Sequence, residues 1–181
     1  MKPELTTDNL CGEAHAFAEQ ESTHNESSIF GVTDGKRLGT YVEHKFQAYL
    51  HERHTYDKGS SAKGIDFPSL GVDMKVTSVR QPQSSCPYSS ARQKIRGLGY
   101  SLLVFVYAKT DDAETQTGNL NILHTVFVDA HRTADYQTTT GIRKIIETEK
   151  SYRRIIGYDQ LWILKAHLDD HQPVAEMRKA S

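Results

Sequence analysis

The sequence has few cysteines, no long apolar run and almost no net charge. Its two cysteines, Cys11 and Cys86, show no C-x-x-C spacing, which argues against a disulfide framework and favours a reducing cytoplasm. The longest apolar run, residues 102–108, is far shorter than the roughly 20 residues that span a bilayer. No hydrophobic signal region stands at the amino terminus. With 181 residues and 37% apolar content, the chain suits one compact α/β domain.

Acidic residues are missing from one long part of the chain. Between Met74 and Thr110 there is no Asp or Glu, whereas six basic residues occur there: Lys75, Arg80, Arg92, Lys94, Arg96 and Lys109. Although the net charge is −1, this segment makes a local positive field that would attract a phosphate backbone. A solvated basic face is the commoner explanation of a charge run. The position of this run beside a pair of acids favours the nucleic-acid interpretation.

Two carboxylates and one ammonium stand close together just before and within that run. Residues 72–77 alternate apolar and polar side chains, which predicts a half-buried strand with Asp73 and Lys75 on the same face. Asp66 lies on the preceding arm, and residues 68–71 predict a turn that folds this arm back beside Asp73. Two acids and a lysine that converge there could hold a divalent cation and orient a water molecule.

This pattern resembles a known nuclease family. Asp66, six residues and then Asp73-Met74-Lys75 are similar to the PD-(D/E)xK signature, although Ile65 rather than proline precedes the first aspartate. The segments 83–87 and 90–94 resemble those of small bacterial type II restriction endonuclease-like proteins. The similarity covers roughly residues 30–130. It implies an α/β fold with a restriction-endonuclease-like central mixed sheet flanked by helices. We expect residues 1–181 to form a single nuclease domain, with its core at about 30–130 and an extension at about 131–172.

The resemblance implies hydrolysis of phosphodiester bonds in double-stranded DNA, leaving a 5′-phosphate. Asp66, Asp73 and the Met74 carbonyl would bind magnesium (Mg²⁺), with Mn²⁺ as a substitute, and Lys75 would orient the water and stabilise charge. A site-specific type II restriction enzyme, acting as a homodimer in the bacterial cytoplasm, is the first hypothesis. The alternatives are a structure-specific repair or recombination nuclease and a non-catalytic DNA-binding subunit. On the spacing alone, a surface β-hairpin with an Asp–Lys pair is equally good.

A helix is predicted from about Thr40 to His54, because apolar residues recur there at helical spacing. Two interpretations of Glu43 are equally favoured. It either completes a capping box with Thr40 or borders the acid pair as a catalytic residue that binds metal through water. His51 and His54 have zinc-ligand spacing, but without a third ligand we expect them, like His44, to be surface residues.

Polar residues after the predicted strand suit contacts with base edges or phosphates, or are an ordinary polar loop. A short helix is expected at about 88–96, ending at Gly97. The candidate DNA-binding residues in these two segments are Arg80, Gln81, Gln83, Ser84, Ser85, Arg92, Gln93, Lys94 and Arg96.

The remaining elements follow from apolar patterning. Residues 100–107 predict a central strand buried on both faces, parallel to the strand of the acid pair because a helix connects them. Another strand is expected at 120–128, after an acidic turn at 110–119. A short helix is expected at 13–21, and a second basic stretch with a last apolar segment lies at 142–168.

Overall fold

The computed structural model describes residues 2–57, 59, 64–82, 88–89, 91–136, 139–141 and 144. The chain divides into two compact units, which are described separately below. The first contains residues 1–85 and 101–128, and the second contains residues 86–100 and 129–181. The segment at 83–87, and the basic stretch and last apolar segment expected at 142–168 apart from residue 144, lie outside the described residues.

Two long helices of the first unit begin earlier than the apolar patterning predicts. Helix α1 (Thr7–Ser22) begins at a capping box formed by Thr6 and Asn9, so the predicted helix at 13–21 is too short. Helix α2 (Gly35–Arg53) begins after Asp34, whose side chain accepts a hydrogen bond from the Lys36 amide at 3.0 Å. The predicted N-cap at Thr40 is therefore wrong. The reason is that Asp34 and Gly35, a typical turn pair, act here as a helix start.

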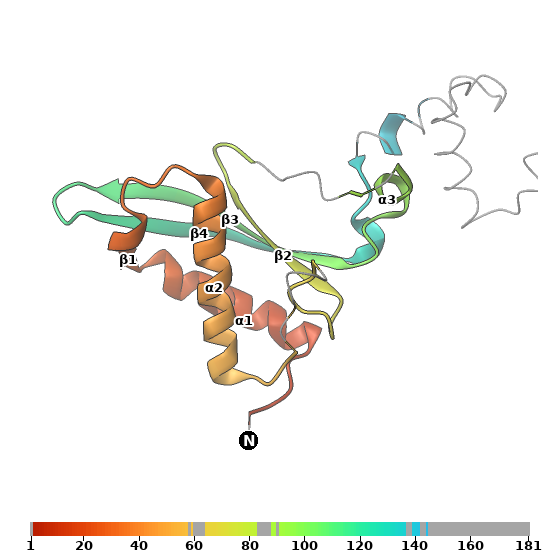
Figure 1. The fold of residues 1–181 in the computed structure, drawn as a ribbon, viewed down its shortest axis with the longest axis horizontal. Helices are drawn as coiled ribbons and strands as arrows, with labels where there is room; N and C mark the ends of the chain where they lie inside the picture. The colour runs from red at the N-terminus through yellow and green to blue at the C-terminus, as the bar shows by residue number, and fades with distance from the viewer. Residues whose placement is uncertain are drawn as a thin grey trace, which may run out of the picture. The chain divides into compact units, whose positions relative to one another are not determined.

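A four-stranded mixed sheet forms the centre of this unit, in the order β1-β4-β3-β2 (Figure 1). Strand β2 (Val72–Ser78) is parallel to β3 (Ser101–Asp112), which is antiparallel to β4 (Thr117–Val128). The two-residue strand β1 (Asn25–Glu26) pairs with β4 and leads into the 3₁₀ helix η1 (Ser27–Ile29). The predicted mixed α/β fold and the parallel pairing of β2 with β3 are thus confirmed.

The hairpin between β3 and β4 is tighter than predicted. Both strands continue into the segment expected to be a turn, so the connection is only residues 113–116. The Asp112 carboxylate accepts hydrogen bonds from the Glu114 amide and the Thr115 hydroxyl, both at 2.9 Å. These side-chain contacts close the hairpin, which explains why an acidic polar segment still contains strand ends.

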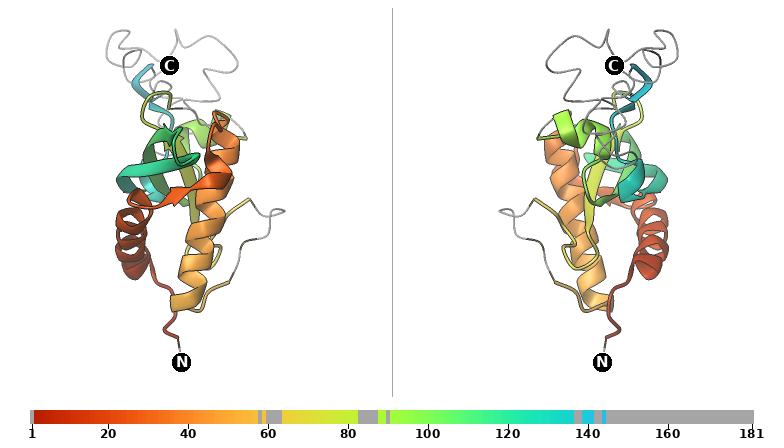
Figure 2. Two further views of the ribbon diagram at one scale, coloured as in Figure 1. Left: turned by 90° about the vertical axis from the view of Figure 1, so that its left-hand side faces the viewer. Right: turned by 90° about the vertical axis from the view of Figure 1, so that its right-hand side faces the viewer.

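The core lies between one face of the sheet and the two long helices. Phe105 of β3 packs its ring against Phe17 of α1 and Phe46 of α2, with centroids 5.9 and 5.1 Å apart. Helix α2 passes in front of α1 in the view of Figure 1, and Figure 2 separates the two helices. Alternate residues of β3 are buried against them, while those on the other face are only half-buried. The prediction that β3 is buried on both faces is therefore right for one face only.

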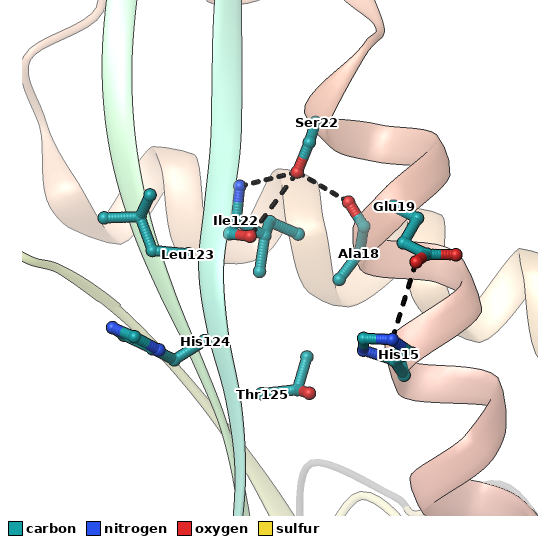
Figure 3. Close-up of a pocket in the computed structure, with 8 residues that line it drawn as sticks. All are labelled: His15, Ala18, Glu19, Ser22, Ile122, Leu123, His124 and Thr125. Atoms are coloured by element: carbon teal, nitrogen blue, oxygen red, sulfur yellow. Dashed lines mark hydrogen bonds and ion pairs between the residues drawn. The ribbon is translucent and has the colours of Figure 1, made fainter.

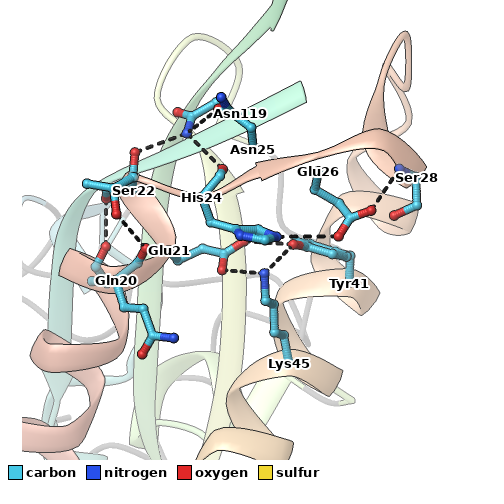
Figure 4. Close-up of polar contacts among 12 residues, drawn as sticks. Gln20, Glu21, Ser22, His24, Asn25, Glu26, Ser28, Tyr41, Lys45 and Asn119 are labelled. Carbon is cyan, nitrogen blue, oxygen red and sulfur yellow. Dashed lines mark hydrogen bonds and ion pairs between the residues drawn. The ribbon is translucent and has the colours of Figure 1, made fainter. Parts of the chain in front are cut away.

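A buried polar network joins α1 to α2 (Figure 4). The Glu21 side chain is only 2% exposed. It pairs with Lys45 Nζ at 2.8 Å and accepts a hydrogen bond from the Tyr41 hydroxyl at 2.8 Å. Burial, reinforced by the hydrogen bond to Glu21, raises the pKa of Tyr41 well above its usual value. The network holds α2 at a fixed position along α1.

Replacing Lys45 with methionine is expected to lower the free energy of unfolding by about 2–3 kcal/mol, because Glu21 would stay buried without its cation. Urea denaturation at pH 7.5 measures the change. Lys36→Met is the matched control, since Lys36 lies on the same helix but is exposed. Equal losses in the two variants would show that the Glu21 pair adds nothing to stability.

His54 corrects another expectation. It ends α2 and is 6% exposed, with Nε2 2.8 Å from a Glu13 carboxylate oxygen on α1. The hydrogen bond from His54 lowers the pKa of Glu13. The prediction that His54 is a surface residue is therefore wrong, because Glu13 of α1 packs against its ring. His44 and His51 are exposed, as expected.

The second unit contains helix α3 (Ala91–Arg96) and the 3₁₀ helix η2 (Ala130–Arg132). Helix α3 is shorter than the predicted 88–96 and ends before Gly97, as expected. Gly97 has a φ of 92°, and a Cβ there would lie 2.7 Å from Thr133 Oγ1. Glycine is therefore required at this position. None of the helices in the described ranges is long and apolar enough to cross a membrane.

Candidate active site

The turn predicted before β2 brings Asp66 back to the strand. Phe67 and Val72 exchange two backbone hydrogen bonds, of 2.9 and 3.2 Å, and the four residues between them form the turn. Gly71 closes it with a φ of 61°. The Asp66 carboxylate then accepts a hydrogen bond from the Met74 amide through Oδ2 at 2.8 Å. The first acid is therefore held beside the backbone of the Asp-Met-Lys segment.

Asp73 and Lys75 lie on β2, an edge strand of the described sheet. Because side chains alternate along a strand, both point to the face opposite the buried Met74. Lys75 Nζ lies 2.7 Å from Asp73 Oδ2. The Asp73 side chain is 6% exposed and the Lys75 side chain 38% exposed. The ammonium thus covers the buried acid and remains open to solvent.

The two aspartates are close enough to affect each other's charge. Burial, together with the nearby Asp73 and Glu43 carboxylates, raises the pKa of Asp66 to about 6, against the lowering effect of the Met74 amide. A carboxylate pair of this kind binds a proton or a cation more readily than a solvated carboxylate does.

Glu43 also belongs to this cluster. The pKa of Glu43 is raised by burial and by the charge of Asp73, while Lys75 lowers it. With the N-cap of α2 at Asp34, the capping-box interpretation of Glu43 is wrong, and its electrostatic contact with Asp73 and Lys75 favours the other one. Among the described residues, no three His, Cys, Asp or Glu side chains are arranged to hold a metal ion together.

Gln47 is a site residue that the sequence patterning missed. It lies one helical turn after Glu43 on α2, and its Nε2 is 3.5 Å from Asp66 Oδ1. The signal that could have found it is the i, i+4 spacing from Glu43, which places both side chains on one helix face.

The candidate DNA-binding residues are placed only in part. Arg80 and Gln81 are exposed just after β2. In the second unit, Gln93 Oε1 accepts hydrogen bonds from the Ser89 amide and hydroxyl at 2.8 and 2.9 Å, so its amide oxygen holds the segment before α3. Lys94 and Arg96 lie half-buried on the same helix. Gln83, Ser84, Ser85 and the Arg92 side chain lie outside the described part of the chain.

A groove of about 360 Å³ lies between α1 and β4 (Figure 3). Its polar lining includes His15, Glu19, Ser22 and His124, and none of the candidate catalytic residues borders it. His15 and Glu19 are 3.5 Å apart and largely exposed. His124 is exposed on this groove. The groove therefore brings no catalytic set together.

A mixed sheet flanked by helices, with Asp73 and Lys75 on an edge strand and Asp66 folded back beside them, is consistent with a restriction endonuclease-like protein. The family model for the type II restriction enzyme NspV matches residues 4–177. The type II restriction enzyme NspV of Nostoc sp. (strain ATCC 29411 / PCC 7524) is 56% identical over 154 residues, which cover 85% of this chain and 70% of that enzyme. No solved structure matches the chain. The chain belongs to the NspV family of type II restriction enzymes.

Proposed function

We propose that the protein is a site-specific endonuclease that hydrolyses phosphodiester bonds in duplex DNA. The observation that supports this most is the turn that folds Asp66 back onto the Asp73-Met74-Lys75 segment. Membership of the NspV family supports the restriction function over a repair or recombination nuclease. We also propose that residues 1–181 form a single nuclease domain.

The donor set fits a hard divalent cation. Asp66 and Asp73 offer carboxylate oxygens, and the Met74 carbonyl offers a third oxygen, which are ligands that Mg²⁺ prefers and Mn²⁺ accepts. Burial first, and the neighbouring Asp73 and Glu43 carboxylates second, raise the pKa of Asp66, and a bound cation would stabilise this buried negative charge. Glu43 lies near enough to act through a bound water. A bound magnesium ion would polarise the phosphate and lower the pKa of its water.

Lys75 has a distinct role in this proposal. An ammonium has three donors, so it can keep its contact with Asp73 and still donate to a phosphate oxygen or to the attacking water. In that position it orients the water and stabilises the negative charge that develops in the transition state. The water attacks phosphorus, and the bond to the 3′ oxygen breaks, which leaves a 5′-phosphate.

DNA contacts are assigned to the acid-free segment. Arg80 and Gln81 are exposed just after the end of β2, the strand that carries Asp73 and Lys75. Gln83, Ser84, Ser85, Arg92, Gln93, Lys94 and Arg96 complete the proposed DNA-binding set. Two equivalent active sites are needed to cut both strands of a palindromic site, so we propose that the enzyme acts as a homodimer.

Digestion of a supercoiled plasmid with Mg²⁺ tests the function. A restriction endonuclease is expected to give discrete linear fragments whose sequenced ends share one short motif and carry 5′-phosphates, and EDTA should stop the reaction. Preference for branched or flapped DNA over linear duplex would favour a structure-specific nuclease instead. Salt-sensitive binding with no cleavage in Mg²⁺ or Mn²⁺ would indicate a non-catalytic subunit.

A further inference from the structure

Glu43 and Gln47 form a short polar face on α2 that is turned toward the acid pair. Their i, i+4 spacing puts the two side chains one above the other. Glu43 interacts electrostatically with Asp73 and Lys75, and Gln47 contacts Asp66. We propose that Gln47 is a positioning residue that fixes the Asp66 carboxylate for binding a divalent cation. This inference rests on the proposed function of the site.

Asp66 is held from several directions. Its backbone carbonyl accepts a hydrogen bond from the Gly59 amide at 3.0 Å, and its Oδ2 accepts one from the Met74 amide at 2.8 Å. Without Gln47, the carboxylate could still rotate about its bond to Cβ while keeping one bond to Met74. The Gln47 amide acts on the other oxygen and restricts this rotation. Each carboxylate oxygen then retains a lone pair for a cation.

Gln47 is itself held in place. Its backbone carbonyl accepts a hydrogen bond from the Tyr56 hydroxyl at 3.0 Å, and α2 is fixed to α1 by the Lys45–Glu21 pair. The donor therefore sits on a rigid support, as precise ligand geometry requires. The distance of 3.5 Å is long for a hydrogen bond. Such a long contact suits a residue that orients the Asp66 carboxylate and contributes little to folding stability.

The neutrality of Gln47 also matters. Asp66 already experiences the charges of Asp73 and Glu43. An amide donates to a carboxylate without adding charge, whereas a glutamate at this position would add a further negative group and could not donate when ionised. A neutral donor is thus the type of side chain that orients Asp66 and leaves its negative charge available to the cation.

The test measures cation binding and cleavage in parallel. Gln47→Met keeps the side-chain length and helix propensity but removes the donor. Calorimetric titration of the full chain with Mn²⁺, without DNA, should show affinity weakened about tenfold. The Mg²⁺ concentration for half-maximal plasmid cleavage should rise by a similar factor, with the rate at saturating Mg²⁺ changed less than about threefold. Gln20→Met, on the exposed face of α1, is the matched control and should behave as wild type.

A double-mutant cycle identifies the route of the effect. In an Asp66→Asn background, Gln47→Met should weaken Mn²⁺ binding no further, because Gln47 acts through Asp66. An equal loss in both backgrounds would overturn the inference, and so would unchanged binding in the single variant. If wild type cleaves and Gln47→Met matches it at every Mg²⁺ concentration, the endonuclease function survives and only the role of Gln47 fails. A wild type that neither binds Mn²⁺ nor cleaves would refute both.

Discussion

Lys75→Met is expected to slow DNA cleavage at saturating Mg²⁺ by about 10²–10³-fold, the usual effect of losing one charge-stabilising donor. Lys75 Nζ lies 2.7 Å from Asp73, and the Lys75 side chain is 38% exposed against 6% for Asp73. Methionine keeps most of the apolar stem but cannot donate to the phosphate or to water. Single-turnover cleavage of a short duplex that contains the recognition site gives the chemical rate directly.

The control for this loss is binding of the same duplex in Ca²⁺. Because Lys75 is one cation within a larger basic segment, its removal should weaken DNA binding by less than about tenfold. Lys36→Met, an exposed lysine on α2, should change neither the rate nor the binding. A cleavage rate within about threefold of wild type for Lys75→Met would remove Lys75 from the mechanism.

Local patterning was sufficient to predict the central part of the site. The alternation of side chains over residues 72–77 predicts β2, and residues 68–71 predict the turn that returns Asp66. Both features depend on residues that are close in sequence, so short-range rules describe them. The same is true of Gly97, which ends α3.

Contacts between distant elements could not be predicted in this way. The i, i+4 spacing places Gln47 on the same helix face as Glu43, but its contact with Asp66 depends on how α2 packs beside the turn before β2. The burial of His54 likewise depends on Glu13 of a different helix. Glu43 shows how one wrong boundary misleads: with Thr40 as an assumed N-cap, a capping role explained the residue fully. Because the N-cap of α2 is Asp34, Glu43 has no capping role. Its charge interacts instead with Asp73 and Lys75.

Asp66→Asn is expected to stabilise the metal-free protein at pH 8 while abolishing cleavage. The pKa of Asp66 rises from 3.8 to about 6 on folding, so the folded state holds this proton more tightly than the unfolded chain does. Above about pH 6 the ionised carboxylate therefore costs stability, and the cost disappears as the pH falls from 6 to below 3.8. The full shift corresponds to about 3 kcal/mol, which solvent screening of this half-buried group reduces to about 1–2 kcal/mol.

Urea denaturation of wild type and of Asp66→Asn, in EDTA at pH 8 and at pH 4, gives the difference in free energy of unfolding between the two proteins. The asparagine oxygen can still accept the hydrogen bond from the Met74 amide, so the variant keeps the local structure. The stability gain should be present at pH 8 and nearly absent at pH 4, because other groups titrate alike in both proteins. Adding Mg²⁺ should stabilise wild type clearly more than Asp66→Asn, since a cation stabilises a protein in proportion to its affinity and the variant keeps only the weaker binding by Asp73 and the Met74 carbonyl. A variant that is less stable than wild type at pH 8 would mean that Asp66 supports the fold rather than straining it for cation binding.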